Sequence, residues 1–306
     1  MMKLNLHISQ PFSPNPSWGQ GFGPAAGLLP GAKRVRAVNL TFLLNTALCA
    51  ALMAGALHAQ TKQVDFELMT WPEVKQALAQ GTTTALIFNG GTEQRGPQGV
   101  NGAHTLIVHQ LGVEIAQKLG NAILAPTIPF SVNRASAALP GTIGITGPVF
   151  AQLNEEVAEQ MIVNGFKNIV LMGDHGGGQQ ELADVAKKLD AKYSGKGIRV
   201  VYCGDIYTKV GTDFNKWLTD HGYPVGSHAS IKDTSELLYL GGDKGWVRKD
   251  EIPNAVGDAQ HRNGIQGDAR RSAPEIGKVV SDMKVEYAVR QIRQLLSEPN
   301  SAVAQK

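Results

Sequence analysis

Apolar positions change their spacing along the chain, and the spacing predicts where strands and helices form. Short apolar runs, each typical of a buried strand, occupy residues 84–89, 122–126, 168–172 and 198–203. Elsewhere apolar residues recur every three or four positions, as in an amphipathic helix. The predicted helices span residues 71–80, 105–119, 148–164, 179–192 and 275–296.

The alternation of these elements predicts the fold class. Strands joined through helices favour parallel pairing, because each helical crossover returns the chain to the same edge of a sheet. We therefore predict an α/β fold with a mostly parallel sheet flanked by helices. Beyond Gly204 the pattern loosens, and we expect loops with one short helix at residues 235–240 before the closing helix. The sequence contains no internal repeat or linker, so residues 60–306 are predicted to form a single domain.

The start of the chain differs in composition from the rest. Three basic residues, Lys33, Arg34 and Arg36, precede a charge-free and mostly apolar stretch at residues 40–57. This order is typical of a secretory signal peptide. Two cleavage sites are possible, after Ala54-Gly55-Ala56 and after Leu57-His58-Ala59, the second being poorer because Leu57 is large. They place the start of the mature chain between residues 57 and 60.

Residues 1–59 are thus predicted to be a leader, with the signal peptide at about 33–59. The chain has 29 basic and 26 acidic residues, and four basic but no acidic residues lie in the leader. The remaining domain has 29 − 4 = 25 basic residues and a formal charge of −1. It has no basic stripe with interleaved aromatic residues, so nucleic-acid binding is not expected. We predict export to the periplasm or medium without a stable membrane anchor. A transmembrane anchor is the alternative, which the lack of a charged stop-transfer cluster disfavours.

Candidate chemistry follows two of the predicted strands. Glu93 comes just after the first strand, and His104 begins the next helix eleven residues later. His175 lies in a glycine-rich loop after the third strand, where it breaks the glycine spacing of a dinucleotide site. Ligands of α/β proteins bind outside the carboxyl ends of strands. One carboxylate and two imidazoles are a common ligand set for catalytic zinc with an open position for water.

A third stretch places His228 five residues before Asp233. The histidine is a candidate proton shuttle, because an imidazole titrates near neutral pH. Asp233 is a candidate fourth metal ligand or a partner of the attacking water. Each of these residues has a plainer alternative as a loop or surface residue that bonds only local backbone or water. Zinc is the favoured metal, with manganese and iron as alternatives.

Two other catalytic designs find less support. A serine hydrolase of the G-x-S-x-G type is disfavoured because the sequence lacks that motif. Cys203 ends a predicted strand and is the single cysteine outside the leader, so the domain has no internal disulfide. A buried structural thiol is a better interpretation of Cys203 than a catalytic one.

Together these stretches resemble the creatininase (creatinine amidohydrolase) family. Its Glu-Gln-His-Gly-Pro, Pro-Gly-Thr, Asn-Gly-His-Gly-Gly and His-Ala-Gly-x-x-Glu-Thr-Ser segments are matched, in order, at residues 93–97, 140–142, 173–177 and 228–235. The resemblance covers residues 65–295. It implies a three-layer α/β fold, a metal site that is often dinuclear with zinc or manganese, and a homo-oligomer, commonly a hexamer. It also implies hydrolysis of C–N bonds in cyclic amides and formamides.

The resemblance also implies roles for individual residues, and some of these roles change where this sequence differs from the family's segments. Glu93 and His175 match metal ligands, His228 matches a catalytic histidine, and Asp233 matches the acidic residue of the last segment. Arg95, however, stands where the family has a ligating histidine, and His104 stands where it has a bridging aspartate. No glutamate follows His175 at the spacing that binds a second metal. We therefore expect one ion, held by Glu93, His104 and His175, with Arg95 replacing the charge of the other and binding a substrate oxygen.

The expected function is that of a metal-dependent hydrolase acting on a C–N bond of a cyclic amide or a related small carbonyl compound. The alternative is a non-catalytic periplasmic protein that binds a small molecule, a pseudoenzyme on the same fold. The lost family ligands favour the alternative, whereas the new histidine at position 104 favours the enzyme.

Overall fold

The computed structural model describes residues 62–133, 139–258 and 262–298, and these belong to one compact unit. The predicted leader lies outside the described residues. Within them, no helix combines the length and the apolar character that crossing a membrane requires.

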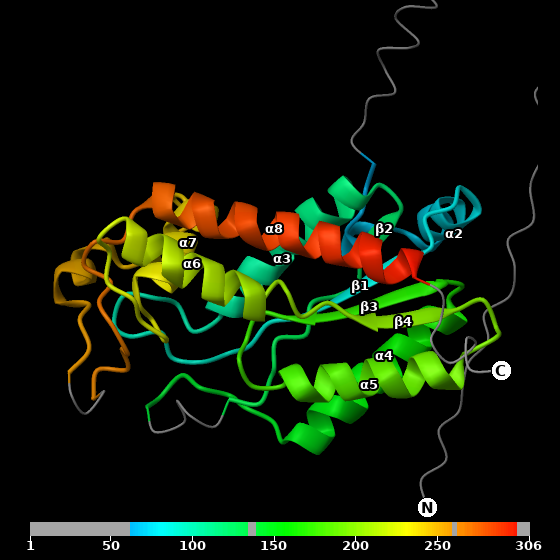
Figure 1. Ribbon diagram of the computed structural model, residues 1–306, viewed down its shortest axis with the longest axis horizontal. Coiled ribbons are helices and arrows are strands. Elements are labelled where there is room, and N and C mark those ends of the chain that lie inside the picture. Colours follow the sequence, from blue (N-terminus) through cyan, green and yellow to red (C-terminus); the bar gives the residue numbers. More distant parts are fainter. Residues whose placement is uncertain (1–61, 134–138, 259–261, 299–306) are drawn as a thin grey trace, which may run out of the picture. The chain divides into compact units, whose positions relative to one another are not determined.

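Four parallel strands form the sheet of the described chain, in the order β2-β1-β3-β4 (Figure 1). They are β1 (Thr84–Asn89), β2 (Ala122–Leu124), β3 (Asn168–Gly173) and β4 (Arg199–Tyr202). All residues of β1 are buried, as expected for a strand covered on both faces. From β1 the chain crosses to one side, to β2, and then returns to the other side, to β3. The loops after β1 and β3 therefore flank the switch point of the sheet, where ligands of such folds bind.

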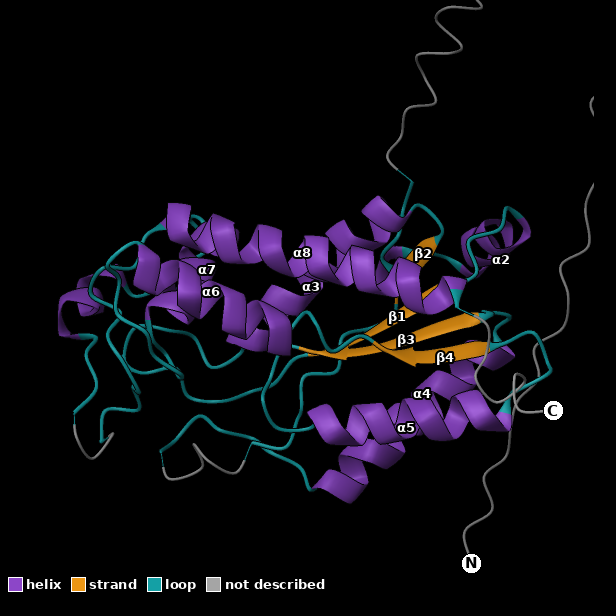
Figure 2. Ribbon diagram, in the orientation of Figure 1, coloured by secondary structure: helices purple, strands orange, loops and turns teal. Residues whose placement is uncertain are grey.

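Helices cover both faces of this sheet (Figure 2). On one face lie α3 and α8, with α6 and α7 beside α8, and on the other face lie α4 and α5 (Figure 1). The bounds are α2 (Trp71–Ala79), α3 (Ala103–Leu119), α4 (Gly147–Val163), α5 (Gln179–Lys192), α6 (Thr208–Asp220), α7 (Ile231–Gly241) and α8 (Pro274–Ser297), with short 3-10 helices η1 (Phe66–Leu68) and η2 (Lys249–Asn254). The predicted three-layer α/β architecture is confirmed.

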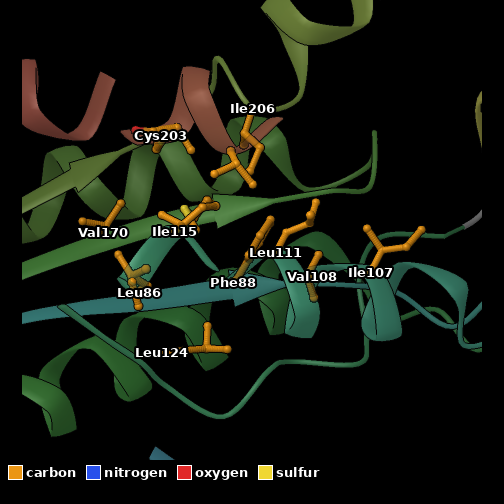
Figure 3. Packing of buried hydrophobic residues seen from close by; sticks show 14 of the residues in the cluster. Leu86, Phe88, Ile107, Val108, Leu111, Ile115, Leu124, Val170, Cys203 and Ile206 are labelled. Carbon is orange, nitrogen blue, oxygen red and sulfur yellow. Dashed lines mark hydrogen bonds between the residues drawn. The ribbon is translucent and has the colours of Figure 1, made fainter. Parts of the chain in front are cut away.

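Alternating residues of the strands fill two separate cores. Leu86 and Phe88 of β1 pack with residues of α3 and α8, and Figure 3 shows them beside Leu111. Ala85 and Ile87 point to the opposite face and pack with α4 and α5. Each fully buried large side chain contributes about 1.5–3 kcal/mol, so the two cores fix the strand ends from which the functional loops depart.

Cys203 belongs to the core between β4 and α8. It is fully buried, and its Sγ lies 4.0 Å from the carbonyl oxygen of Ala288. Burial raises the pKa of the thiol to about 12, which keeps it protonated and unreactive at neutral pH. The predicted structural thiol is therefore confirmed.

One segment of the prediction was wrong. Residues 208–220, expected as loop, form α6, which buries Val210, Phe214 and Leu218 at four-residue spacing. This helical period is present in the sequence, but Gly211 and the polar residues between the three apolar positions obscure it. The helix predicted at residues 235–240 begins earlier, at Ile231, and its first turn carries Asp233. All other predicted elements agree with the structure to within about two residues, the usual uncertainty of helix and strand ends.

Candidate metal centre

The loops after β1 and β3 meet the loop before α7 around a cavity of about 270 Å³, here named the inner cavity. Further lining residues, among them Leu139, Tyr207 and Gln266, come from other parts of the sequence. All the site residues predicted from the sequence line it: Glu93, Arg95, His104, His175, His228 and Asp233.

Three of these residues are arranged like the ligands of a metal ion. The two carboxylate oxygens of Glu93 face different imidazoles, with Oε1 3.1 Å from His104 Nε2 and Oε2 3.3 Å from His175 Nε2. All three residues offer ligand atoms within 4.8 Å of one another. Metal–ligand bonds of about 2.0–2.1 Å in a tetrahedral site separate the ligand atoms by roughly 3.3–3.4 Å. The donor set therefore fits a divalent cation.

The charge state of Glu93 suits that role. Its side chain is almost completely buried, and burial by itself opposes ionisation. The hydrogen bond with His175 and the guanidinium of Arg95 outweigh this effect and hold the pKa of the Glu93 carboxyl well below its usual range. The carboxylate is therefore available as an anionic ligand at neutral pH.

A carboxylate orients His104, the second residue of α3, through the ring nitrogen that faces away from Glu93. Its Nδ1 lies 2.7 Å from Asp174 Oδ2, so Nδ1–H donates to Asp174 and the Nε2 lone pair faces Glu93. Burial and the charge of Arg95 lower the pKa of His104 to about 4, so the imidazole is neutral at pH 7. A histidine held by a carboxylate on one nitrogen is the usual arrangement of a metal ligand.

Asp174 is in turn held by a fully buried lysine. Lys284 of α8 donates to Asp174 Oδ1 at 2.6 Å and to Glu236 Oε2 of α7 at 2.7 Å. These two carboxylates raise the pKa of Lys284 despite its burial, whereas burial raises the pKa of Glu236. Lys284 thus holds Asp174 in place, and Asp174 in turn orients His104.

Sequence reasoning missed these three supporting residues, Asp174, Glu236 and Lys284. One signal was available, because Lys284 occupies a position in the apolar series of α8, between Val280 and Ala288 at four-residue spacing. A lysine on the buried face of a helix needs a carboxylate partner, since burying a charge alone is costly. The identity of that partner is not visible in the sequence.

The glycine loop after β3 controls His175. Gly177 presents its N–H 3.0 Å and its carbonyl oxygen 3.2 Å from His175 Nδ1, so it can stabilise either neutral tautomer. When the carbonyl accepts from Nδ1–H, the Nε2 lone pair is free for a cation. Only glycine fits here, because a Cβ at position 177 would lie 2.0 Å from the carbonyl oxygen of Val132.

Arg95 lies among the ligands and is buried. Its Nη1 donates to Asp233 Oδ2 at 2.9 Å, and its Nη2 lies 3.2 Å from Glu93 Oε1 and contacts His104 Nε2. The guanidinium thus supplies a positive charge inside the ligand set. Since Nη2 and a metal ion would use the same lone pair of His104, metal binding requires this contact to open.

Asp233 is not part of the group of ligand atoms. Its carboxylate, at the first turn of α7, pairs with Arg95, and the guanidinium holds the pKa of Asp233 below its usual range although burial opposes this. In this structure Asp233 positions Arg95, and the fourth-ligand role considered from the sequence stays a prediction.

His228 faces the same group from the opposite loop. Its Nε2 lies 3.0 Å from the side-chain amide nitrogen of Gln94, which can only donate, and 2.8 Å from the carbonyl oxygen of Gln94, which can only accept. When the carbonyl is the partner, Nε2 carries the proton. The Nδ1 lone pair then faces Glu93 Oε1 at 3.6 Å. Burial and the charge of Arg95 lower the pKa of His228, which favours the neutral ring. The next residue, Ala229, has a left-handed φ of 52°, a strained conformation typical of functional sites.

Comparison with known proteins identifies the same architecture elsewhere. The family profile described as "Creatininase: Creatinine amidohydrolase" matches residues 67–292. No curated protein sequence matches the chain.

Several solved structures share the fold. One is titled "Creatininase Mn", with a TM-score of 0.62, 18% identity, and coverage of 78% of this chain and 100% of that one. A mutant creatininase of the "Zn-Zn type" gives 0.61 with the same identity and coverage. A putative creatinine amidohydrolase from Bacteroides fragilis gives 0.60 at 16% identity, covering 78% of this chain and 98% of that one. At these identities the likeness shows the fold.

Proposed function

Because the chain belongs to the creatininase family, we propose that it is a metal-dependent hydrolase acting on the C–N bond of a cyclic amide or a related small carbonyl compound. The observation that carries this proposal is the meeting of Glu93, His104 and His175 in one cavity, with His104 oriented by a buried carboxylate. The manganese and zinc forms of the similar structures support a divalent ion. Zinc is the favoured metal, since a Glu/His/His set is common for catalytic zinc.

The ion would be held by Glu93, His104 and His175. When bound, it lowers the pKa of a water ligand and polarises a substrate carbonyl. We propose one ion per chain, because Arg95 already supplies a positive charge beside Glu93 and is fixed by Asp233. A guanidinium remains charged at any working pH, so it replaces the charge of a second cation without needing ligands.

His228 carries the proton in this proposal. Its Nδ1 accepts a proton from the attacking water and then donates it to the leaving nitrogen, while the carbonyl of Gln94 retains the proton on Nε2. Arg95 stabilises negative charge on the substrate oxygen through the guanidinium that faces Glu93. Asp174 and Lys284 keep His104 in the ligating tautomer throughout.

A second candidate is a protein on this fold that binds a small molecule without turnover. The contact between Arg95 Nη2 and His104 Nε2 favours it, because the guanidinium then takes the place of the cation. In that case the inner cavity holds a ligand through hydrogen bonds to Arg95 and His228. The two candidates differ in whether the protein retains a metal ion.

Elemental analysis of the purified mature protein separates them. We expect about one zinc or manganese ion per chain, lost in His104→Ala. His228→Ala should keep the ion and reduce turnover of cyclic amides by about 10²–10⁴-fold. His221→Ala is the matched control, since His221 stacks on Trp217 outside the inner cavity. A metal-free protein after purification with excess metal would favour the binding protein, and two ions per chain would contradict the single-ion site.

Export and self-association are further parts of the proposal. The basic and apolar residues of the leader support export, and the family resemblance supports a homo-oligomer, commonly a hexamer. Intact mass of the exported protein should place its first residue between positions 57 and 60. Light scattering of the same sample measures its oligomeric state.

A further inference from the structure

A second hollow of about 630 Å³, here named the outer groove, adjoins the inner cavity. The groove is lined mostly by polar residues and glycines, with Thr208, Thr212 and Asn215 on one face of α6. Four residues line both spaces and form the boundary between them: Tyr207, Ser227, Lys232 and Gln266.

Lys232 is the charged residue of this boundary. Its Nζ lies 3.8 Å from Asp233 Oδ1, an ion-pair distance that is too long for a hydrogen bond. The other oxygen of Asp233 accepts from Arg95 at 2.9 Å. Within the described part of the chain, the ammonium of Lys232 therefore makes an ion pair but donates no hydrogen bond.

The charged residues that line the inner cavity are Glu93, Arg95, Asp174, Lys232 and Asp233, with a formal sum of 2 − 3 = −1. Arg95 bridges Glu93 and Asp233, and Asp174 accepts from Lys284, which lies outside the lining. A divalent cation on Glu93 adds two positive charges to this balance, so positive charge then exceeds negative charge around the inner cavity. A concave site with an excess of one sign attracts a ligand of the opposite sign.

We propose that the substrate carries a carboxylate, which Lys232 binds at the boundary between the inner cavity and the outer groove. The substrate class is then a cyclic amide with a carboxylate substituent, and the amide carbonyl lies toward Glu93 while the carboxylate lies toward α7. This inference rests on the proposed function and deepens it.

Two lactams that differ only in the carboxylate provide the test. 5-Oxoproline and 2-pyrrolidinone share the same five-membered ring, and only the former is an anion at neutral pH. Calorimetry with the zinc-loaded protein should show about 10- to 100-fold tighter binding of 5-oxoproline, the range expected for a hydrogen bond between charged groups. Hydrolysis of both compounds is followed in parallel as release of the ring-opened amino acid.

Variants of Lys232 test whether this residue causes the preference for 5-oxoproline over 2-pyrrolidinone. Lys232→Met should remove it while leaving metal content and 2-pyrrolidinone binding unchanged, and Lys232→Arg should retain most of it. Lys209→Met is the matched control, because Lys209 lies on α6, pairs with Asp213 and lines neither the inner cavity nor the outer groove.

The outcomes separate this inference from the proposed function. Preferential binding that depends on Lys232, without hydrolysis, would support the carboxylate site and contradict the hydrolase. Hydrolysis of both lactams at equal rates, unaffected by Lys232→Met, would support the hydrolase and overturn the carboxylate site. Failure of the zinc-loaded protein to distinguish the two lactams in binding would also overturn it.

Discussion

Among the described residues, two groups place carboxylate and imidazole atoms within 4.8 Å of one another, and only one of the two has the surroundings that a metal site needs. The first consists of Glu93, His104 and His175, and the second of Asp65, Glu67 and His109. In the first group the ligand atoms face the inner cavity and the rings are held from behind.

In the second group the carboxylate oxygens of Asp65 already accept hydrogen bonds within the protein. Asp65 Oδ1 accepts from the backbone N–H of Glu67 and caps η1, and Asp65 Oδ2 bonds His109 Nε2 at 2.8 Å. Glu67 is exposed to solvent, and none of the three residues lines the inner cavity or the outer groove. Nearness of ligand atoms is therefore not sufficient. A site also needs lone pairs that point into a cavity and a buried shell that holds them there.

The largest expected effect comes from removing that shell. Lys284→Met leaves Asp174 and Glu236 buried without their counter-charge, which should cost about 3–5 kcal/mol of unfolding free energy. Loss of the support to His104 should also weaken zinc affinity by about 10–100-fold. Denaturant unfolding and chelator competition measure the two effects.

Two further variants distinguish a specific loss of support to His104 from a general loss of folding. Lys278→Met removes an exposed lysine of the same helix, which pairs with Asp282, and should change neither quantity. Asp174→Asn removes the charge next to His104 while keeping the size of the side chain. Unchanged zinc affinity in a folded Asp174→Asn protein would show that His104 needs no such support.

An intermediate effect is expected from pH in the metal-free protein. The folded pKa of His104, about 4, lies below its unfolded value of 6.5, so the unfolded chain takes up a proton first as the pH falls. The stability present above pH 6.5 should therefore decrease between pH 6.5 and 4, by about 3 kcal/mol for this residue. Unfolding free energies measured across this window for the wild type and His104→Asn isolate the contribution. Equal slopes in the two proteins would refute it.

The smallest effect is expected from the second group. His109→Ala removes a hydrogen bond between a partly exposed imidazole and the buried carboxylate of Asp65, so stability should fall by about 1 kcal/mol. The number of bound metal ions per chain should not change. Loss of one equivalent of metal in His109→Ala would mean that the exposed group binds an ion, and the comparison between the two groups would fail.

Much of the fold follows from the order of apolar residues. The runs at β1 and β3, and the four-residue spacing in α3 and α5, predict parallel strands with helical crossovers, and the structure confirms them. The position of Glu93, His104 and His175 after strand ends was sufficient to predict that they meet. These predictions succeed because they depend on contacts close in sequence and on the one rule that parallel strands end at a common edge.

The supporting contacts could not be predicted in the same way. Arg95 pairs with a carboxylate 138 residues away, and Lys284 with one 110 residues away. Nothing in the sequence distinguishes Lys232 from the other lysines. The tertiary structure places it at the boundary between the inner cavity and the outer groove. The sequence by itself determined the layers of this protein and the loops that bear its chemistry. Only the tertiary structure decided which buried charges neutralise one another, because those partners lie on elements that meet only when the helices pack on the sheet.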